Sequence, residues 1–574
     1  MLAAVSALDE RNSLAFSADG RYIVATSGSS GAGGPTSVSQ VIANLLPVVG
    51  VDGVLCRMVD PVSVVIWDEH ERTLTLARDR MGQADIYFMC GPFGLVFSSE
   101  LKTLRQEAGG PPDVDPQAIS QLFRYGYIPA PLTSYRGIYK LPAGTMRVFH
   151  LPDVHGGYHG GEAAGRLTPH WSLKEEAEAQ MASREPCGID RSVERVVASL
   201  ERAICTARTG STATLLSGGV DSSLVTALLQ RHSEGPVETI SVGFDDPGHD
   251  ESEWAAAVAH LLGARNTRLV MEDANAIRLV ERMPRVFCEP YADSSAIPTL
   301  LAAEAAGARC STILTGDGGD ELFFGHASYV KSLRNFGLVR HVPLGLRRAC
   351  GAYAFRSPER ARLGGIPALM SEAKSRSLAE TYLARVSRWR DPSRALKSAN
   401  EPVPPFLDAA RHPAGGHQGE LLLYLDQTNE LSEGLMTKSD RAFGAFGVQA
   451  RSPFLDPGVV SLAWGTPFEN KLREGETKVV LKRALERFLP EHHARRPKKG
   501  FGAPVARWLN GPLRDWAEDL LDPIAMRNRG ILDEQVVSTL WTSFLNGNRK
   551  YHTHLWPVLM FQAWDREWNR TNAP

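Results

Sequence analysis

Residues 215–224 read LLSGGVDSSL, and this stretch decides the fold class of the larger part of the chain. Two apolar residues, as at the end of a strand, are followed by a serine and two glycines, whose backbone can approach a phosphate group closely. Asp221, Ser222 and Ser223 then open a helix at its N-terminal end, where the helix dipole favours an anion. The stretch therefore predicts a strand, a phosphate-binding loop and a helix.

The predicted loop contains no lysine. In the GxxxxGK[ST] loop of many ATPases, a lysine stabilises charge on the β- and γ-phosphates. A loop that binds pyrophosphate without this lysine favours cleavage between the α- and β-phosphates of ATP, which releases pyrophosphate and leaves AMP on an acyl group. The structural alternative is a tight strand-to-helix turn with a serine cap.

Apolar runs alternate with helical periodicity after residue 190, as in ETISVGF (238–244) and STIL (311–314). This alternation is typical of a parallel sheet wound with helices. Ligands of such sheets bind at the carboxyl ends of the strands, where SGGVDSS and TGDGGDE (315–321) both fall. Asp221 and Asp320 are therefore predicted ligands of Mg²⁺, which also keeps phosphate and water oxygens. A plain surface turn is the alternative for DGGDE.

The first 150 residues contain short β-rich runs such as RYIVAT and SVVIWD, separated by turn signals, and predict a sheet-dominated domain. A Gly-rich composition follows, typical of a linker. His150, His155 and His159 in this region are interpreted as part of the solvated linker rather than as metal ligands. The expected domains are 1–160 and 191–574, joined by a linker at 161–190.

The composition is that of an ordinary soluble globular protein: 574 residues, 43% hydrophobic, 22% charged and a formal net charge of -2. It suggests neither a nucleic-acid nor a membrane partner. Seven scattered cysteines without a CxxC pair favour a reducing compartment. The opening MLAAVSALDERN lacks the features of a signal peptide, and no run of 18 apolar residues occurs, so we expect a cytoplasmic protein.

A basic run, HHARRPKKGFGAP, occupies residues 492–504. Runs of this kind usually form a solvated face. The glycines here favour another interpretation, a mobile loop that closes a lysine over an adenylate. His492 and His493 are expected at the surface.

Long ordered strings over most of the chain resemble the asparagine synthetases of the glutamine-hydrolysing type. They include RDRMGQADIYF, RYGYIPAPLTSYRGIYKLPAG, LLSGGVDSSL, TISVGFDDPGHDESEWA, EPYADSSAIPT, LTGDGGDELFFG, KSDRAFGAFGVQARSPFLD and RPKKGFGAPVARWL. The resemblance implies an α/β protein with an N-terminal α+β sandwich of the glutaminase (N-terminal nucleophile) type. It also implies a C-terminal pyrophosphatase-loop domain with a Rossmann-like parallel sheet, which adenylates a carboxylate for attack by an amine.

The resemblance also implies roles for individual residues. Asp317 would be an acid in the formation of the intermediate, and Lys498 would stabilise the charged transition state. Mg²⁺ would bind Asp221 and Asp320. The residues implied for ATP are Leu216, Ser217, Gly218, Gly219, Asp221, Ser222, Ser223, Val242, Thr315 and Gly316.

The first domain departs from the family pattern. The nucleophilic Cys that follows the initiator Met in the family is Leu2 here. Ser27, Gly28 and Ser29 begin SGSSGA where the family has a glutamine-binding NGEIYN string, and Pro35 replaces an Asp. We therefore interpret this domain as a degenerate glutaminase.

Loss of the glutaminase with retention of the synthetase is also found in β-lactam synthetases and lasso-peptide cyclases, which use an amine of the substrate. Asp317 argues against the first, because β-lactam synthetases have Tyr there. Gln449 replaces the Glu of the family's VEAR string, so strict aspartate specificity is not implied.

The leading hypothesis is an amide-forming ligase that adenylates a small-molecule or peptide carboxylate and uses ammonia or a substrate amine. The alternatives are a glutamine-dependent asparagine synthetase, which requires an upstream Cys, a lasso-peptide cyclase and a non-catalytic scaffold. A homodimer is compatible with each of them.

Overall fold

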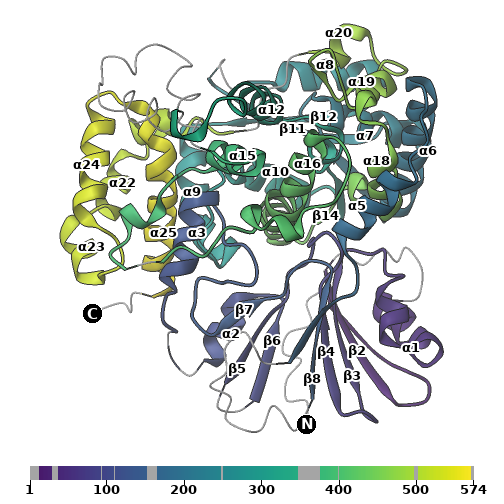
Figure 1. The fold of residues 1–574 in the computed structure, drawn as a ribbon, viewed down its shortest axis with the longest axis horizontal. Helices are drawn as coiled ribbons and strands as arrows, with labels where there is room; N and C mark the ends of the chain where they lie inside the picture. Colours follow the sequence, from purple (N-terminus) through teal and green to yellow (C-terminus); the bar gives the residue numbers. More distant parts are fainter. Residues whose placement is uncertain are drawn as a thin grey trace.

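The structure is a computed structural model that describes residues 12–28, 37–91, 94–108, 110, 112–150, 165–246, 250–346, 375–398, 400–496 and 502–569. An N-terminal body of antiparallel strands lies against a larger C-terminal body, in which helices surround a parallel sheet (Figure 1). The predicted α/β fold, with an α+β sandwich followed by a Rossmann-like domain, is confirmed.

The larger sheet of the N-terminal body has six strands in the order β1-β2-β3-β4-β8-β9, all paired antiparallel. Burial alternates along β2, as expected for a strand with one face in a core. Helix α1 (Val38–Leu55) packs against β1 and β2. The strands are β1 (Asn12–Phe16), β2 (Tyr22–Gly28), β3 (Val62–Asp68), β4 (Thr73–Ala77), β8 (Thr145–His150) and β9 (Arg166–Pro169).

Helix α1 is long and apolar enough, by length and composition, to cross a membrane. Ile42, Ala43 and Leu46 are nevertheless buried in one cluster with Val24 and Val64 of the sheet, as in a core helix of a globular protein. The length and composition of α1 are therefore only weak evidence for a membrane span. The cytoplasmic location stays a prediction.

The smaller sheet of the N-terminal body has the order β6-β5-β7. Helix α2 (Leu101–Glu107) packs against it, whereas α3 (Pro116–Tyr125) extends to α25 (His552–Trp568) of the C-terminal body (Figure 1). The strands are β5 (Tyr87–Gly91), β6 (Gly94–Ser98) and β7 (Ile138–Lys140).

From residue 165 onward, the segment predicted as a linker, 161–190, forms regular elements: a strand of the N-terminal body and helices of the C-terminal body. Strand β9 pairs with β8 of the N-terminal sheet. Helix α5 (Leu173–Ala182) packs against α18 (Pro457–Gly465), because Leu173 and Ala177 give it a buried apolar face. His150 is the exposed last residue of β8. His155 and His159 lie outside the described residues.

The C-terminal body contains a five-stranded sheet in the order β12-β11-β10-β13-β14, in which every pairing is parallel. Strands β11 and β12 lie on one side of β10, and the later strands β13 and β14 lie on the other side, so the direction in which strands are added reverses at β10. In sheets of this kind ligands bind at such a reversal, next to the carboxyl ends of the strands. The strands are β10 (Thr212–Leu215), β11 (Glu238–Phe244), β12 (Arg265–Met271), β13 (Thr312–Leu314) and β14 (Gln449–Arg451).

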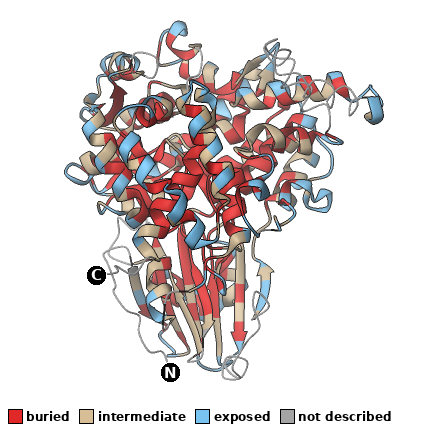
Figure 2. Cartoon of the chain, turned by 90° about the vertical axis from the view of Figure 1, so that its left-hand side faces the viewer, coloured by how far each residue is buried: buried red, intermediate tan, exposed pale blue. Residues whose placement is uncertain are grey.

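Helices cover this sheet and account for most of the buried residues (Figure 2). The described part of the region between 330 and 440 is largely helical, as predicted, and includes a π-helix at Gln427–Leu435. The other α-helices are α6 (Ile189–Ala207), α7 (Val220–Arg231), α8 (Ser252–Leu262), α9 (Asp273–Phe287), α10 (Ala296–Gly307), α11 (Gly319–Phe323), α12 (Ala327–Val339), α15 (Leu378–Val386), α16 (Gln418–Asp426), α17 (Met436–Gly444), α19 (Val479–Leu485), α20 (Glu491–Ala494), α21 (Val505–Leu509), α22 (Arg514–Leu520), α23 (Pro523–Arg529) and α24 (Glu534–Leu545).

Candidate functional site

A cavity of 1020 Å³ lies beside the carboxyl ends of β10, β11 and β13. It gathers residues from the loop after β10, from β11 and from the loop after β13, which are far apart in the sequence. The site residues predicted from the sequence that line it are Leu216, Ser217, Gly219, Asp221, Ser222, Val242, Thr315, Gly316, Asp317 and Asp320.

The loop after β10 is closed by its own hydroxyl groups. The Ser222 hydroxyl lies 3.0 Å from that of Ser217 and accepts a hydrogen bond of 3.2 Å from the Ser217 backbone N–H. Gly218 has a φ of 71°, and a Cβ there would lie 2.9 Å from the backbone nitrogen of Ala255, so glycine is required. Neither Gly218 nor Ser223 lines the cavity, and Ser223 is buried beneath the loop.

Gly316 brings the second loop against the first. A Cβ at this position would lie 2.9 Å from the Cβ of Asp221 and from the backbone nitrogen of Ser222. Such contacts are closer than real Cβ atoms make, so the two loops can meet only at a glycine. This close approach explains how Asp221 and the TGDGGDE residues come to share one cavity.

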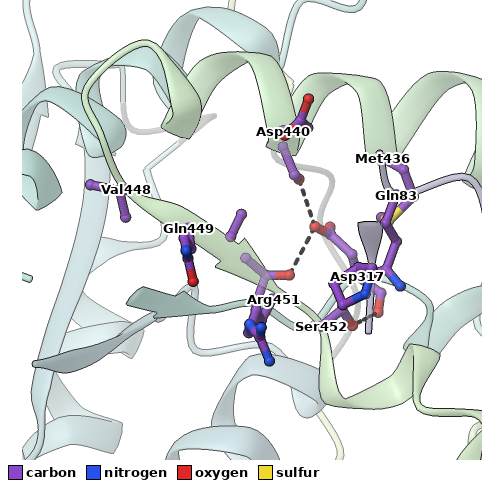
Figure 3. Close-up of a pocket in the computed structure, with 12 residues that line it drawn as sticks. Gln83, Asp317, Met436, Asp440, Val448, Gln449, Arg451 and Ser452 are labelled. Carbon is purple, nitrogen blue, oxygen red and sulfur yellow. Dashed lines mark hydrogen bonds between the residues drawn. The ribbon is translucent and has the colours of Figure 1, made fainter. Parts of the chain in front are cut away.

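Asp317 is held by two hydroxyl groups. The hydroxyls of Thr315 and Ser439 each donate to its Oδ2 at 2.9 Å. Ser439 belongs to α17, so this helix and the loop after β13 position the carboxylate together. Asp317 also lines a second, much smaller pocket, to which Gln83 of the N-terminal body and Gln449 of β14 contribute (Figure 3).

The predicted metal ligands Asp221 and Asp320 both contact one ammonium group. The Nζ of Lys478 donates to Asp221 Oδ2 and lies 2.6 Å from Asp320 Oδ1. Lys478 is buried, and burial alone lowers its pKa, but the two carboxylates raise the pKa above the usual lysine value.

Two carboxylates around one cation fit the ligand set of a magnesium ion that also binds substrate phosphates. In the described part of the chain no group of three or more His, Cys, Asp or Glu side chains could hold a metal. A site with two protein carboxylates therefore depends on phosphate and water oxygens for its remaining ligands.

No sequence pattern predicts a functional role for Lys478, which lies in the string GETKVVLKRAL (475–485). It adopts a left-handed backbone conformation with a φ of 56° just before α19. A lysine in this conformation is uncommon, and such strain tends to occur at functional sites. A second pair missed from the sequence, Lys438 and Asp293, lines the cavity with a 3.5 Å separation of Nζ and Oδ2.

The basic run at 492–504 is described up to residue 496. Arg496 lines the cavity and pairs with Glu251. His492 is exposed, as predicted, but the surface prediction for His493 is wrong. His493 lies in the short helix α20, and its ring is buried against Trp254, with ring centroids 5.4 Å apart. Lys498 lies outside the described residues.

The positions at which the first domain departs from the family pattern are described only in part. Ser27 and Gly28 end β2, and a Cβ at Gly28 would lie 2.7 Å from the carbonyl oxygen of Pro61. Leu2, Ser29 and Pro35 lie outside the described residues.

Comparison with known proteins agrees with this architecture. Residues 198–566 match a family model described as asparagine synthase, and residues 35–155 match a glutamine amidotransferase domain. A putative glutamine-hydrolysing asparagine synthetase of Mycobacterium tuberculosis is 28% identical over 527 residues, covering 89% of this chain and 77% of the relative.

Two further relatives also match most of the chain, at lower identity. Asparagine synthetase [glutamine-hydrolyzing] 1 of Bacillus subtilis is 24% identical over 87% of this chain and 76% of its own length. Amidase chry2 of Gibberella zeae is 22% identical over 82% of this chain and 73% of its own length. The chain therefore belongs to the asparagine synthase family and is an ATP-dependent carbon–nitrogen ligase.

Proposed function

We propose that the protein activates a carboxylate as an acyl-adenylate and transfers the acyl group to ammonia or to a substrate amine, without a glutaminase of its own. The observation that carries this proposal is the pair Asp221 and Asp320, held around one buried cation beside a phosphate-binding loop at the reversal of strand order. Two partly buried carboxylates are costly to desolvate, and a scaffold that does not bind nucleotide gains nothing from placing them around one buried cation.

In the first step a carboxylate oxygen of the substrate attacks the α-phosphorus of ATP. The bond from this phosphorus to the bridging oxygen breaks, and pyrophosphate leaves. Ser217, Gly219 and Ser222 are the residues that would bind the departing phosphates, supported by their position at the start of α7. Asp221 and Asp320 would hold Mg²⁺, which neutralises phosphate charge when it is bound.

In the second step the amine attacks the acyl carbon, and AMP leaves with the electron pair of the broken carbon–oxygen bond. Asp317 would act on the acyl side of the site, which is supported by its place in the cavity wall and by the hydroxyls that orient it. Lys498 would stabilise the negative charge that develops on the attacked carbonyl oxygen and on AMP. The attacking amine loses one proton to water during the step, so the products are the amide, AMP and a proton.

A substrate that is a zwitterionic amino acid would suit the pair Lys438 and Asp293 in the wall of the cavity. Lys438 Nζ also donates to the Ser295 hydroxyl at 2.9 Å, and that hydroxyl donates to Asp293 at 2.6 Å. The pair offers a cation for an α-carboxylate and an anion for an α-ammonium group. Because Gln449 replaces a Glu of the family, the acid substrate can be one other than aspartate.

The first prediction concerns glutamine. Because Ser27 and Gly28 stand where the family has its glutamine-binding string and Pro35 replaces an acid of that site, the purified protein should release no glutamate from glutamine. The measurement is glutamate formation with and without ATP and Mg²⁺, and ammonium chloride should support turnover where glutamine does not.

The alternative is a glutamine-dependent asparagine synthetase, which the printed names of the bacterial relatives favour. Glutamate release that rises with protein concentration would establish that alternative.

A further inference from the structure

A cluster of six charged side chains lies buried where the two bodies meet. We name it the interdomain ion cluster, and every member has a side chain less than 10% exposed. The N-terminal body contributes two cations and an acid, and the C-terminal body contributes two acids and a cation. The members are Arg78, Asp85 and Lys140 on one side and Glu289, Glu433 and Arg441 on the other.

Arg78 is the centre of this cluster. Its Nη2 lies 2.6 Å from Asp85 Oδ1 and its Nη1 lies 2.9 Å from Glu433 Oε1. The same guanidinium donates to the carbonyl oxygen of Leu141 at 3.0 Å and to that of Ser432 at 3.3 Å. Arg78, the residue after β4, thus joins the N-terminal body directly to the π-helix of the C-terminal body.

The remaining contacts close the cluster. Arg441 Nη2 lies 3.4 Å from Asp85 Oδ2, and Lys140 Nζ lies 3.2 Å from Glu289 Oε2. Burial raises the pKa of Asp85, but Arg78, Lys140 and Arg441 lower it by more, so its carboxylate stays ionised. Three cations and three anions balance in charge. Buried ion pairs contribute little net stability, and their best-attested effect is to fix one arrangement of the parts that they join.

The three members from the C-terminal body are close in sequence to residues of the candidate site. Glu433 lies in the π-helix that runs directly into α17. Arg441 is two residues beyond Ser439, which donates to Asp317. Glu289 is four residues before Asp293, the partner of Lys438. The cluster therefore holds both chain segments that form the acyl side of the cavity.

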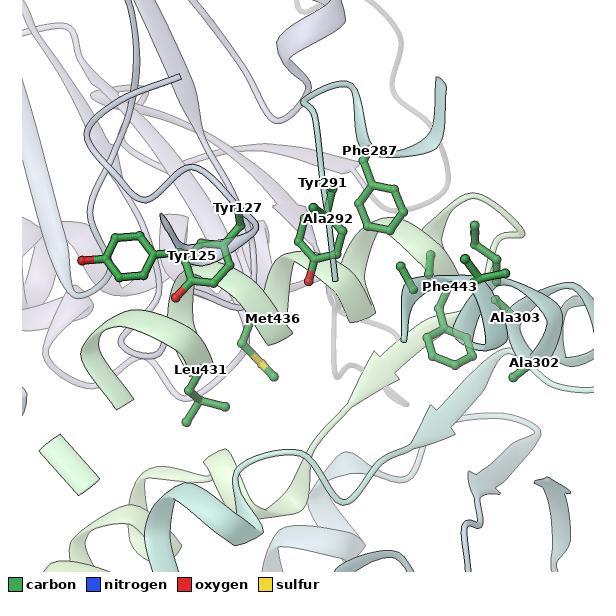
Figure 4. Close-up of a cluster of buried hydrophobic side chains, with 14 of the residues drawn as sticks. Tyr125, Tyr127, Phe287, Tyr291, Ala292, Ala302, Ala303, Leu431, Met436 and Phe443 are labelled. Atoms are coloured by element: carbon green, nitrogen blue, oxygen red, sulfur yellow. The ribbon is translucent and has the colours of Figure 1, made fainter. Parts of the chain in front are cut away.

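Packing reinforces these contacts. Tyr127 of the N-terminal segment, Tyr291 and Met436 belong to one continuous hydrophobic cluster (Figure 4). The Tyr291 hydroxyl donates to the carbonyl oxygen of Gly434 at 3.0 Å. A Cβ at Gly434 would lie 2.8 Å from the Tyr127 ring, so the π-helix meets this ring as closely as a glycine permits.

We propose that the N-terminal body serves as a positioning platform for the acyl side of the synthetase site, and that Arg78 is the positioning residue that holds α17 and its Ser439 on Asp317. This inference rests on the proposed function only for the role of Asp317. The phosphate loop lies on β10 and α7, which the cluster does not contact, so nucleotide binding does not depend on Arg78.

The test is hydrogen–deuterium exchange on the full chain with Arg78→Met and Glu433→Gln. Glu433→Gln removes the charge with little change of shape and keeps an acceptor for the backbone N–H of Ala130. This second variant provides the test if Arg78→Met does not fold. Amides of 427–441 should exchange at least about tenfold faster in either variant, because a buried charge loses its partner. Amides of 214–225 should be unchanged, as should the affinity for α,β-methylene-ATP.

Arg529→Met is the matched control, since Arg529 pairs at 3.0 Å with the fully buried Asp565 between α23 and α25. It should leave exchange in 427–441 unchanged, and Arg78→Lys should restore part of the protection. Unchanged exchange of 427–441 in both test variants would overturn the inference, as would an equal acceleration over the whole chain. Because no readout needs turnover, failure here is distinct from failure of the proposed function.

Discussion

Lys478→Met should destabilise the protein by about 3 kcal/mol in the absence of metal, because it leaves the partly buried Asp221 and Asp320 without their shared cation. Methionine keeps the length and the apolar stem of the side chain, so the lost charge dominates the effect. Addition of MgCl₂ should then raise the midpoint of thermal unfolding of the variant by more than that of the wild type, because the ammonium no longer competes for the carboxylates.

Lys482→Met is the control for this experiment. Lys482 also lines the cavity, one helical turn beyond Lys478, but its partner is Glu476 at 3.1 Å. The control variant should respond to MgCl₂ as the wild type does. If MgCl₂ stabilises Lys478→Met no more than it stabilises the wild type, Asp221 and Asp320 are not metal ligands.

Lys498→Ala should abolish product formation and leave ATP binding nearly intact. The resemblance to the family aligns Lys498 with the lysine that meets the adenylate, and a positioned ammonium contributes about a hundredfold or more to the rate. The phosphate loop is made by other residues, so the affinity for ATP should not change. Steady-state turnover and equilibrium binding of a non-hydrolysable ATP analogue measure the two effects separately.

The neighbouring Lys499 provides the matched control for Lys498. It carries the same charge in the same basic run, so Lys499→Ala tests whether general electrostatic attraction explains the effect. We expect a mild loss of activity. An inactive Lys499→Ala with an active Lys498→Ala would refute the assignment of Lys498. If both substitutions are harmless, the basic run is better interpreted as a solvated face.

The parallel sheet and the cavity beside it were predictable because their signals are local. In LLSGGVDSSL the strand, the close-approach glycines and the helix start are adjacent in the sequence, and the same holds for STIL followed by TGDGGDE. The rule that ligands bind at the carboxyl ends of parallel strands then brings Asp221 and Asp320 together without knowledge of the remaining contacts.

The features that were missed depend on contacts between distant segments. Lys478 is 257 residues from Asp221, and nothing in its own string marks it as a partner. His493 is buried only because α20 meets Trp254. The segment 161–190 carries part of a Gly-rich composition that is typical of a linker. Its elements β9 and α5 are stabilised by β8 and α18, which lie elsewhere in the sequence, so the local pattern does not predict them.

The proposed function requires that ATP is cleaved between its α- and β-phosphates to activate a carboxylate. The direct measurement uses ATP labelled at the α- and γ-phosphates, with Mg²⁺, ammonium chloride and a panel of carboxylic acids that begins with L-aspartate. We predict AMP and pyrophosphate in equal amounts, formed only with an accepted acid and lost in Asp221→Asn. Formation of ADP and orthophosphate as the primary products would contradict the account.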